Sequence, residues 1–294
     1  MRRTATARIR GSAIVAQGGT APFRPGVLRL IKVLGPTAIW AAYLLLIIPY
    51  AALRGVGAHT FRPFDMEGIE QHIFVIEPTR FLQQHIYRHD LVWFDYAGFV
   101  LHLSWFFVPF VFGVCVMVLE RRRLMEFFAW ALTAYYLSDL FFLAFPVRPP
   151  WMEPGITRIL LERSFIQYTG LDNNPFAAFP SMHACLPMVL TLFFFLRCDR
   201  ARFLGWFTGV YALLIGFAVV YLGEHWVLDV LGGYALAGLV AVLFMNGRLR
   251  QLYGRIPGDP VGQVIRFNDA IWWKPPAEAG EEPEPLVVPE QEAA

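Results

Sequence analysis

Long apolar runs, separated by short polar segments that carry arginine, dominate the pattern along the chain. A run of about 20 apolar residues is long enough to cross a bilayer as a helix. Six runs reach that length: Val33–Leu53, Ala97–Leu119, Phe127–Val147, Phe176–Leu196, Phe203–Leu222 and Trp226–Met245. The fourth is the least regular, because Pro180, Ser181 and His183 interrupt its beginning. The pattern predicts an all-α, polytopic membrane protein with six transmembrane helices.

The connection between the first two runs has a pattern of its own. Apolar residues recur there at near-helical spacing, with Glu and Gln between them and Pro78 separating two halves. They are Ile69, Ile73, Phe74 and Ile76, then Phe81, Leu82 and Ile86. This spacing predicts one or two short amphipathic helices at the membrane interface. A structural collar and a lid that guides substrate are both open interpretations.

Composition supports a membrane protein. Of the 294 residues, 56% are hydrophobic and 16% charged, whereas a soluble domain has roughly 45–50% apolar and about 25% charged residues. The net charge of +2 argues against a nucleic-acid partner. Three cysteines are too few for a disulfide framework or a zinc cage. These counts exclude a water-soluble globule and a small secreted scaffold.

Lys and Arg in the connecting segments predict the orientation, because cytoplasmic loops carry an excess of them. Sixteen fall on the side that holds the N-terminus, and seven on the other. Both termini are therefore expected to be cytoplasmic. The expected organisation is a cytoplasmic N-terminal segment (1–32), a six-helix membrane catalytic domain (33–246) and a disordered cytoplasmic tail (255–294), since the end of the chain is rich in Pro, Glu and Ala.

Polar groups collect at the outer ends of three runs. They are Arg148-Pro149-Pro150, Pro180-Ser181-Met182-His183, and His225 with Asp229. The charge pattern is independent of these residues, yet it places all three groups at one membrane face. Ionisable groups at membrane depth are functional by default. The sequence therefore predicts a single site beneath the outer lipid headgroups.

Each group also has a structural interpretation. Arg148 could extend to the headgroups, and Ser181 could simply cap a helix. His183 alone could be an ordinary interior histidine. His225 and Asp229, one helical turn apart, could form a structural hydrogen bond or half of a metal site. Their convergence at one face is what favours a functional site.

The combination suits phosphoryl transfer. An arginine fork matches phosphate oxygens, and a helix beginning at Ser181 presents unpaired N–H groups to an anion. A histidine oriented by a carboxylate is a competent nucleophile or base, and a second histidine can protonate the leaving oxygen. Two other classes stay open: a metal-dependent hydrolase with His183, His225 and Asp229 as ligands, and a transporter that only binds an anion or lipid.

The three motifs resemble those of the type 2 phosphatidic acid phosphatase (PAP2) superfamily. The longer stretches Phe145–Trp151, Asn174–His183 and Tyr221–Trp226 are most similar to its inositolphosphotransferase branch, which includes inositol phosphorylceramide synthases. The resemblance implies a lipid phosphate as substrate, water or a polyol such as inositol as acceptor, and no cofactor. It further implies the following roles: His225 as nucleophile, Asp229 as its partner, His183 as general acid, and Arg148 on the phosphate.

The chain departs from the superfamily pattern at two cations. Phe141 and Val219 stand where the motifs usually have a lysine and an arginine. Arg158 or Arg163, in the same outer loop, could replace one of them. A phosphodiester carries less charge than a phosphomonoester and needs fewer cations. The deficit therefore favours transfer from a phospholipid over simple dephosphorylation.

Several polar residues outside the motifs are weaker candidates. Asn173 and Asn174 could bind a polyol acceptor, although asparagines before a helix are commonly turn formers. Glu224 could bind an acceptor hydroxyl or change the pKa of His225. Three further ionisable residues lie at membrane depth without a motif: Asp95, His102 and Asp139. They could pair with one another or touch the acceptor.

Overall fold

The computed structural model describes residues 24–56, 63–87, 91–164, 174–246 and 260–272. Within these ranges the regular structure is helical apart from two isolated bridges, so the predicted all-α class is confirmed. The α-helices are α1 (Pro25–Val56), α2 (Met66–Ile73), α3 (Pro78–His85), α4 (Val92–Ser104), α5 (Val108–Leu119), α6 (Leu124–Ala144), α7 (Ile159–Glu162), α8 (Met182–Arg197), α9 (Leu204–Tyr221), α10 (Val227–Met245) and α12 (Pro260–Ile271).

Four helices in the described ranges are long and apolar enough to cross a membrane. They are α1, α6 with the short turn before it, α9 and α10, and the bent pair α4 and α5 makes a fifth. Helix α8 is apolar but has 16 residues, which is about 24 Å at the rise of an α-helix and less than the ~30 Å hydrocarbon core. Every predicted run thus contains a helix. Four of the runs, or five if the bent pair is one span, are long and apolar enough to cross a membrane.

Two predicted helix boundaries are wrong. The second run is not one helix, since α4 and α5 are separate and bent by 57°. Pro109 lies in the first turn of α5, and without an N–H group it cannot donate to the carbonyl of Trp105, which favours a break. The fourth run becomes helical only at Met182, because Pro180 and the cap position Ser181 precede the helix.

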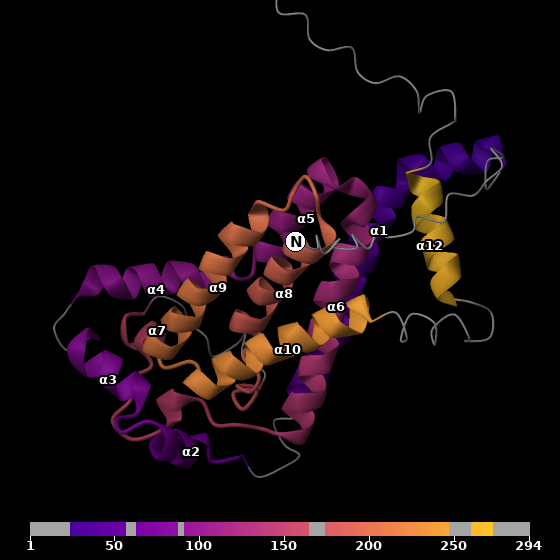
Figure 1. The fold of residues 1–294 in the computed structure, drawn as a ribbon. Helices are drawn as coiled ribbons and strands as arrows, with labels where there is room; N and C mark the ends of the chain where they lie inside the picture. The colour runs from indigo at the N-terminus through magenta and orange to yellow at the C-terminus, as the bar shows by residue number, and fades with distance from the viewer. Residues whose placement is uncertain (1–23, 57–62, 88–90, 165–173, 247–259, 273–294) are drawn as a thin grey trace, which may run out of the picture.

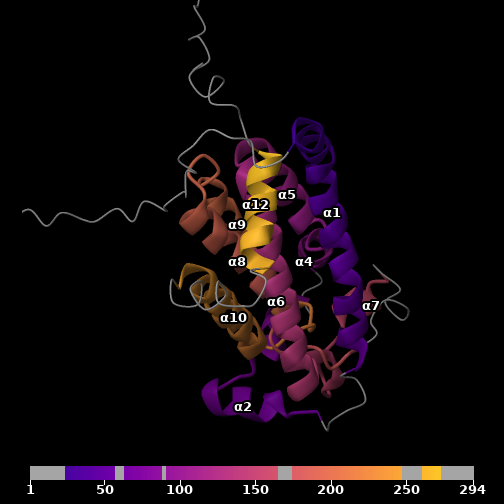
Figure 2. The same ribbon diagram turned by 90° about the vertical axis from the view of Figure 1, so that its right-hand side faces the viewer.

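Helix α8 lies at the centre of the bundle. It packs mainly against α9 and α10, and also against α6, as Figure 1 shows. Helix α1 lies along α6 and α12 on one side, which is seen best in Figure 2. Helices α2 and α3 lie together at one end of the bundle, beside the start of α10 and the end of α9. The N-terminus of the central helix is therefore surrounded by other elements.

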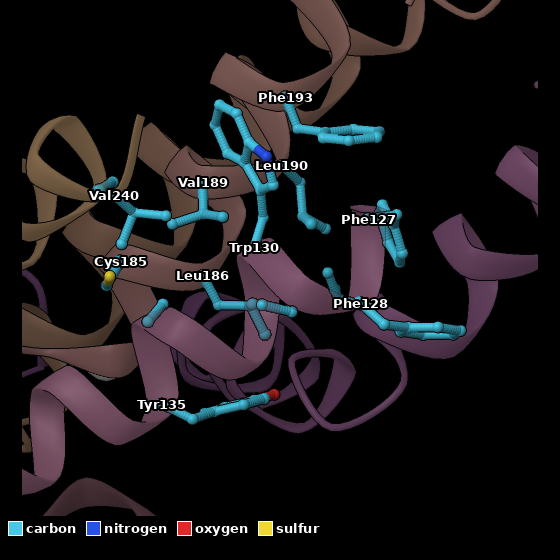
Figure 3. Close-up of a cluster of buried hydrophobic side chains, with 14 of the residues drawn as sticks. Phe127, Phe128, Trp130, Tyr135, Cys185, Leu186, Val189, Leu190, Phe193 and Val240 are labelled. Atoms are coloured by element: carbon cyan, nitrogen blue, oxygen red, sulfur yellow. The ribbon is translucent and has the colours of Figure 1, made fainter. Parts of the chain in front are cut away.

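Aromatic and branched side chains of α6, α8 and α10 form the core between these helices (Figure 3). Phe193 of α8 packs edge-on against Phe127 and Trp130 of α6, with ring centroids 5.4 and 5.6 Å apart. All three side chains are fully buried. The core fixes α8 against α6, so the beginning of α8 has a defined position.

A close contact fixes α10 against the same end of α8. The Ser181 amide donates a hydrogen bond of 2.9 Å to the Asp229 carbonyl. Gly233 faces the same turn, where a Cβ atom would collide with the Ser181 carbonyl oxygen and lie 3.1 Å from the Cys185 amide nitrogen. Glycine at this position allows the two backbones to approach.

The connection from α1 to α4 contains the two predicted short helices. Glu70 of α2 accepts a 2.7 Å hydrogen bond from the Leu228 amide. Gln83 of α3 donates to the carbonyls of Thr157 (2.8 Å) and Tyr221 (3.1 Å). Burial raises the pKa of Glu70 to about 7. Buried polar contacts of this kind fix both helices to the bundle.

The prediction of a disordered tail over 255–294 is wrong for α12. This helix packs on α1, where Ile271 lies against Gly35. Phe267, Ile271 and Trp272 recur at helical spacing and join the hydrophobic core, so the segment has enough apolar surface to order itself. Residues 1–23 and 273–294, which make up most of the two terminal segments, lie outside the described residues.

The contact at Gly233 can be tested by adding one methyl group. We expect Gly233→Ala to destabilise the protein by about 1–3 kcal/mol, the usual cost of overpacking, and to lower its Tm in detergent. Gly238→Ala in the same helix is the matched control, because nothing lies within 4 Å of the added Cβ. An equal Tm for both variants would contradict the close approach.

Candidate active site

A cavity of about 430 Å³ opens at the N-terminus of α8. The end of α1, the bend between α4 and α5, the loop after α6 and the turn between α9 and α10 complete its wall. Its polar side chains include three histidines and two arginines: His102, His183, His225, Arg54 and Arg158. The volume lies within the range of ~300–1,000 Å³ typical of ligand sites.

A tight turn between α9 and α10 places His225 in this wall. Gly223 has φ +80°, and a Cβ atom there would lie 2.8 Å from the Thr157 carbonyl oxygen. The amides of Glu224 and His225 both donate to the Val219 carbonyl, at 3.0 and 3.2 Å. The turn therefore needs glycine, and it holds the His225 backbone close to the end of α9.

His225 lies between His183 and Asp229. Its Nε2 is 3.1 Å from Nδ1 of His183, and its Nδ1 is 3.5 Å from Oδ2 of Asp229. The same Asp229 oxygen accepts a 2.9 Å hydrogen bond from the Trp226 amide, and the carboxylate is fully buried. A carboxylate beside Nδ1 leaves Nε2 as the reactive nitrogen. The structure thus brings His183, His225 and Asp229 together, three of the five residues expected to converge at one site.

Two rings from α4 and the bend after it fix the orientation of His183. His102 stacks on it, with ring centroids 4.4 Å apart and planes at 28°. Trp105 lies 4.9 Å away on a tilted plane, and its indole N–H donates to the Met182 carbonyl at 2.9 Å. His102 thus belongs to the cavity wall.

The other two ionisable residues without a motif do not line the cavity. Asp95 pairs with Arg163 at 2.8 Å and accepts a hydrogen bond from the Tyr221 hydroxyl. Asp139 is buried on α6, and within the described part of the chain neither of its carboxylate oxygens has a hydrogen-bond partner. Arg163 pairs with Asp95 outside the cavity lining, so of the two arginines suggested by the sequence only Arg158 lines the cavity.

Arg148 does not line the cavity. Its side chain is 53% exposed, and Nη1 lies 4.0 Å from Oε1 of Glu153. Burial, and next the nearby carboxylate of Glu67, raise the pKa of Glu153. The Arg148 side chain is therefore near Glu153, while its carbonyl accepts a 2.6 Å hydrogen bond from the Trp226 indole.

Arg158 and Arg54 supply the positive charge of the cavity instead. Arg158 forms two hydrogen bonds with Glu224, of 2.8 and 3.0 Å, and lies 4.4 Å above the Trp151 ring. Glu224 thus fixes the guanidinium group of Arg158, a role that differs from the two expected from the sequence, which were to bind an acceptor hydroxyl or to change the pKa of His225. Arg54, at the end of α1, also lines the cavity.

The cap of α8 contributes through its backbone. Met182 and His183 line the cavity, so the helix N-terminus with its unpaired N–H groups lies at the wall. The Ser181 side chain is fully buried and is not part of the lining. Among the described residues its hydroxyl has no hydrogen-bond partner. The predicted anion site at this helix start thus depends on main-chain groups.

Asn174 behaves as a turn former. Its Nδ2 donates to the Arg54 carbonyl at 2.7 Å, and its Oδ1 accepts from the Phe176 amide at 3.0 Å. The residue lines the cavity, but its amide already holds the end of α1 to the loop before α8. Asn173 lies outside the described residues.

Sequence reasoning missed Arg54 and Trp105 as parts of the site. Arg54 ends the first apolar run at the same predicted face as the three motifs, and that coincidence was the available signal. Trp105 gave no comparable signal, because its role depends on the bend between α4 and α5.

The side chains of His183, His225 and Asp229 are not arranged to bind one metal ion together. Across the described ranges, no group of three or more His, Cys, Asp or Glu side chains is placed to hold one. His225 lies between His183 and Asp229 and directs a different ring nitrogen to each. The three side chains therefore do not converge on a common point.

A helical membrane domain with two histidines and a buried aspartate at an arginine-lined cavity defines a class of membrane enzymes that act on phosphate groups. The chain belongs to the PAP2 superfamily, whose sequence model matches residues 70–243. This confirms the resemblance found in the motifs.

Named relatives support the inositolphosphotransferase branch. The inositol phosphorylceramide synthase catalytic subunit of Schizosaccharomyces pombe is 32% identical over 200 residues, which are 60% of this chain and 43% of that protein. The phosphoinositol dihydroceramide synthase of Bacteroides thetaiotaomicron is 26% identical over 234 residues, covering 69% and 74%. An undecaprenyl-diphosphatase of Bacillus subtilis is 32% identical over 120 residues, covering 40% and 58%. The chain thus spans less than half of the yeast relative, and no solved structure matches it.

The two arginine assignments can be separated by mutation. If Arg158 binds the phosphate, Arg158→Ala should lower kcat/KM for a lipid phosphate at least tenfold, because a charge-assisted hydrogen bond is worth about 1.5–3 kcal/mol. Arg148→Ala should lower it less than threefold. A larger loss for Arg148→Ala than for Arg158→Ala would restore Arg148 to the phosphate site.

Proposed function

We propose that this protein is a lipid phosphotransferase that moves a phosphoinositol headgroup from a phospholipid to a lipid alcohol of the ceramide type. The pairing of His225 Nε2 with His183, in a cavity lined by arginines, carries the proposal. The names of the yeast and Bacteroides relatives indicate the headgroup and the acceptor.

In the first half-reaction Nε2 of His225 attacks phosphorus in line with the ester bond to diacylglycerol. As the new P–N bond forms, the P–O bond breaks and His183 gives its proton to the departing alkoxide oxygen. Asp229, beside Nδ1, stabilises the positive charge that develops on His225. The products are diacylglycerol and a phosphohistidine that carries inositol.

In the second half-reaction His183 acts as the base. It removes the proton from the acceptor hydroxyl, whose oxygen attacks phosphorus as the P–N bond breaks. The phosphodiester passes to the acceptor, and both histidines return to their starting protonation states. No metal or cofactor takes part in either step.

A phosphodiester fits the positive charge available. The two superfamily positions occupied here by Phe141 and Val219 lack their cations, and the described cavity lining holds two arginines, of which Arg158 is paired with Glu224 in the same lining. A diester carries one negative charge, which needs fewer cations than a monoester. We assign Arg158, Arg54 and the N-terminus of α8 to the phosphate, with Arg148 outside the phosphate site.

Hydrolysis is the second candidate, because one relative is an undecaprenyl-diphosphatase. Water would then take the place of the lipid alcohol in the second half-reaction. Transfer to free inositol is a third reaction, also expected from the motifs. Inositol, a polyol, would then be the acceptor in the second half-reaction. An assay that contains a lipid alcohol, water and inositol distinguishes the three reactions, because each acceptor gives a different product.

We further propose that all six apolar runs span the membrane, with α4 and α5 as one bent span and α8 as a short one. Both termini would lie in the cytoplasm and the cavity at the outer face. The excess of Lys and Arg on the connections between α5 and α6 and between α8 and α9 supports this orientation. Helices α2 and α3 would then lie in the outer interface.

Cysteine labelling tests this orientation in a Cys115→Ala background. Val75→Cys, fully exposed between α2 and α3, should react with a membrane-impermeant maleimide on intact cells. Arg122→Cys, exposed between α5 and α6, should react only after permeabilisation. The reverse pattern would exclude the proposed orientation, whatever the enzyme does.

The chemistry is tested with phosphatidylinositol labelled with phosphorus-32, and ceramide as the acceptor. His225→Ala should abolish both transfer and labelled enzyme, because the nucleophile is lost. His183→Ala should slow transfer by about 10²–10⁴-fold, the usual contribution of general acid–base catalysis. The covalent label should survive alkali and be released by acid, as expected for a P–N bond.

His72→Ala is the control, since His72 is exposed on α2 and is not among the lining residues of the cavity. It should transfer as the wild type does. Labelled protein that persists in His225→Ala would rule out His225 as the nucleophile. Free inositol phosphate formed even with ceramide in excess would favour the hydrolase.

A further inference from the structure

A second cavity, of about 290 Å³, adjoins the candidate active site. The two cavities have four lining residues in common: Tyr50, Arg54, Trp105 and Phe106. The second lies between α1, the bend from α4 to α5, the start of α5, and α6. Apart from Arg54 and the tyrosine hydroxyls, its wall consists of apolar and aromatic side chains.

One face of α1 provides half of this wall. Tyr43, Ile47, Tyr50, Ala51 and Arg54 recur at the spacing of a single helical stripe. Pro109 and Phe110 of α5 and Tyr135 of α6 line it from the other helices. Helix α1 lies outside the segment matched by the superfamily model, so this cavity is formed partly by an element beyond that core.

The order of the lining residues gives the cavity a polar end and an apolar end. Arg54 is at the end of α1 that borders the active site, and Tyr43 lies three turns earlier in the helix. A molecule that occupies both cavities would thus have its charged part beside Arg54 and the histidines. Its other part would lie among Ile47, Phe110 and Tyr135. That is the layout of a phospholipid.

We propose that the second cavity holds an acyl chain of the phosphate-bearing lipid while its phosphate lies at His225. We favour the phosphate-bearing donor lipid over the lipid alcohol acceptor as the occupant. Arg54, which lines both cavities, is a cation, and the anionic phosphate next to the acyl chain would lie beside it. The inference rests on the proposed function only for the identity of the headgroup. Helix α1 then contributes both to phosphate binding and to selection of the lipid.

Photocrosslinking tests this without turnover. The probe is a phosphatidylinositol with a diazirine in the middle of one acyl chain, added to the full-length His225→Ala protein in nanodiscs. Adducts are expected on the segments 43–54 and 105–110. Adding Ala51→Trp, which fills the second cavity only, should reduce those adducts at least fivefold.

Ala42→Trp is the matched control, because Ala42 is exposed on the same helix and lines neither cavity. It should leave the adducts unchanged. Ile47→Trp is a second filling variant, with the same expected result if Ala51→Trp does not fold. Adducts spread evenly around α1, or insensitive to both filling variants, would overturn the proposal.

A ceramide with a diazirine in its acyl chain distinguishes the two lipids. Labelling of the segments 43–54 and 105–110 by the ceramide and not by the phosphatidylinositol would reassign the cavity to the acceptor and overturn the proposal as stated. The crosslinking uses the inactive His225→Ala variant, so its result does not depend on turnover. A wild-type protein that transfers no headgroup would contradict the proposed function alone. The two ideas therefore fail separately.

Discussion

The contact between Asp229 and the start of α8 is the interaction on which the site depends. The Asp229 carbonyl accepts from the Ser181 amide, and its carboxylate accepts from the Trp226 amide while lying beside Nδ1 of His225. One residue thus caps α10, holds the beginning of α8 and orients a histidine. Gly233 permits the close approach. This contact between α8 and α10 holds His183 and His225 within hydrogen-bond distance of each other.

Other buried polar side chains act at the same end of the bundle. Glu70 caps the start of α10, Gln83 bonds to the ends of two other elements, and Glu224 holds Arg158. An unpaired polar group is costly in an apolar environment, so each of these pairs restricts where its segment can lie. The loops around the cavity are therefore held by hydrogen bonds as well as by apolar packing.

The helical class could be predicted from the sequence because long apolar runs indicate where helices form. The motifs also indicated that His183, His225 and Asp229 lie near one another, although His225 precedes α10 and does not share a helix face with Asp229 as the four-residue interval had predicted. Arg148 was different. Its guanidinium group lies 4.0 Å from Glu153, a residue of the following loop, and its side chain is largely exposed outside the cavity lining. No local pattern indicated that position.

The bend after α4 and the order of α12 also escaped prediction. Pro109 is tolerated in the first turn of a helix, so it did not by itself indicate a break. The apolar stripe of α12 lies within a segment whose composition, averaged over its length, is that of a disordered chain. The break after α4 coincides with the missing N–H group of Pro109, whereas α12 is ordered by its packing on the distant helix α1.

The positions of the arginines suggest how such a site can vary while its chemistry stays the same. The histidines and Asp229 must meet within hydrogen-bond distance, so their motifs are constrained. A cation acts over a longer range and can come from any element whose side chain reaches the cavity. Here the two positions taken by Phe141 and Val219 are apolar, while Arg158 enters from a loop and Arg54 from α1. Because α1 lines both cavities, our two proposals assign phosphate binding and lipid fit to the same helix.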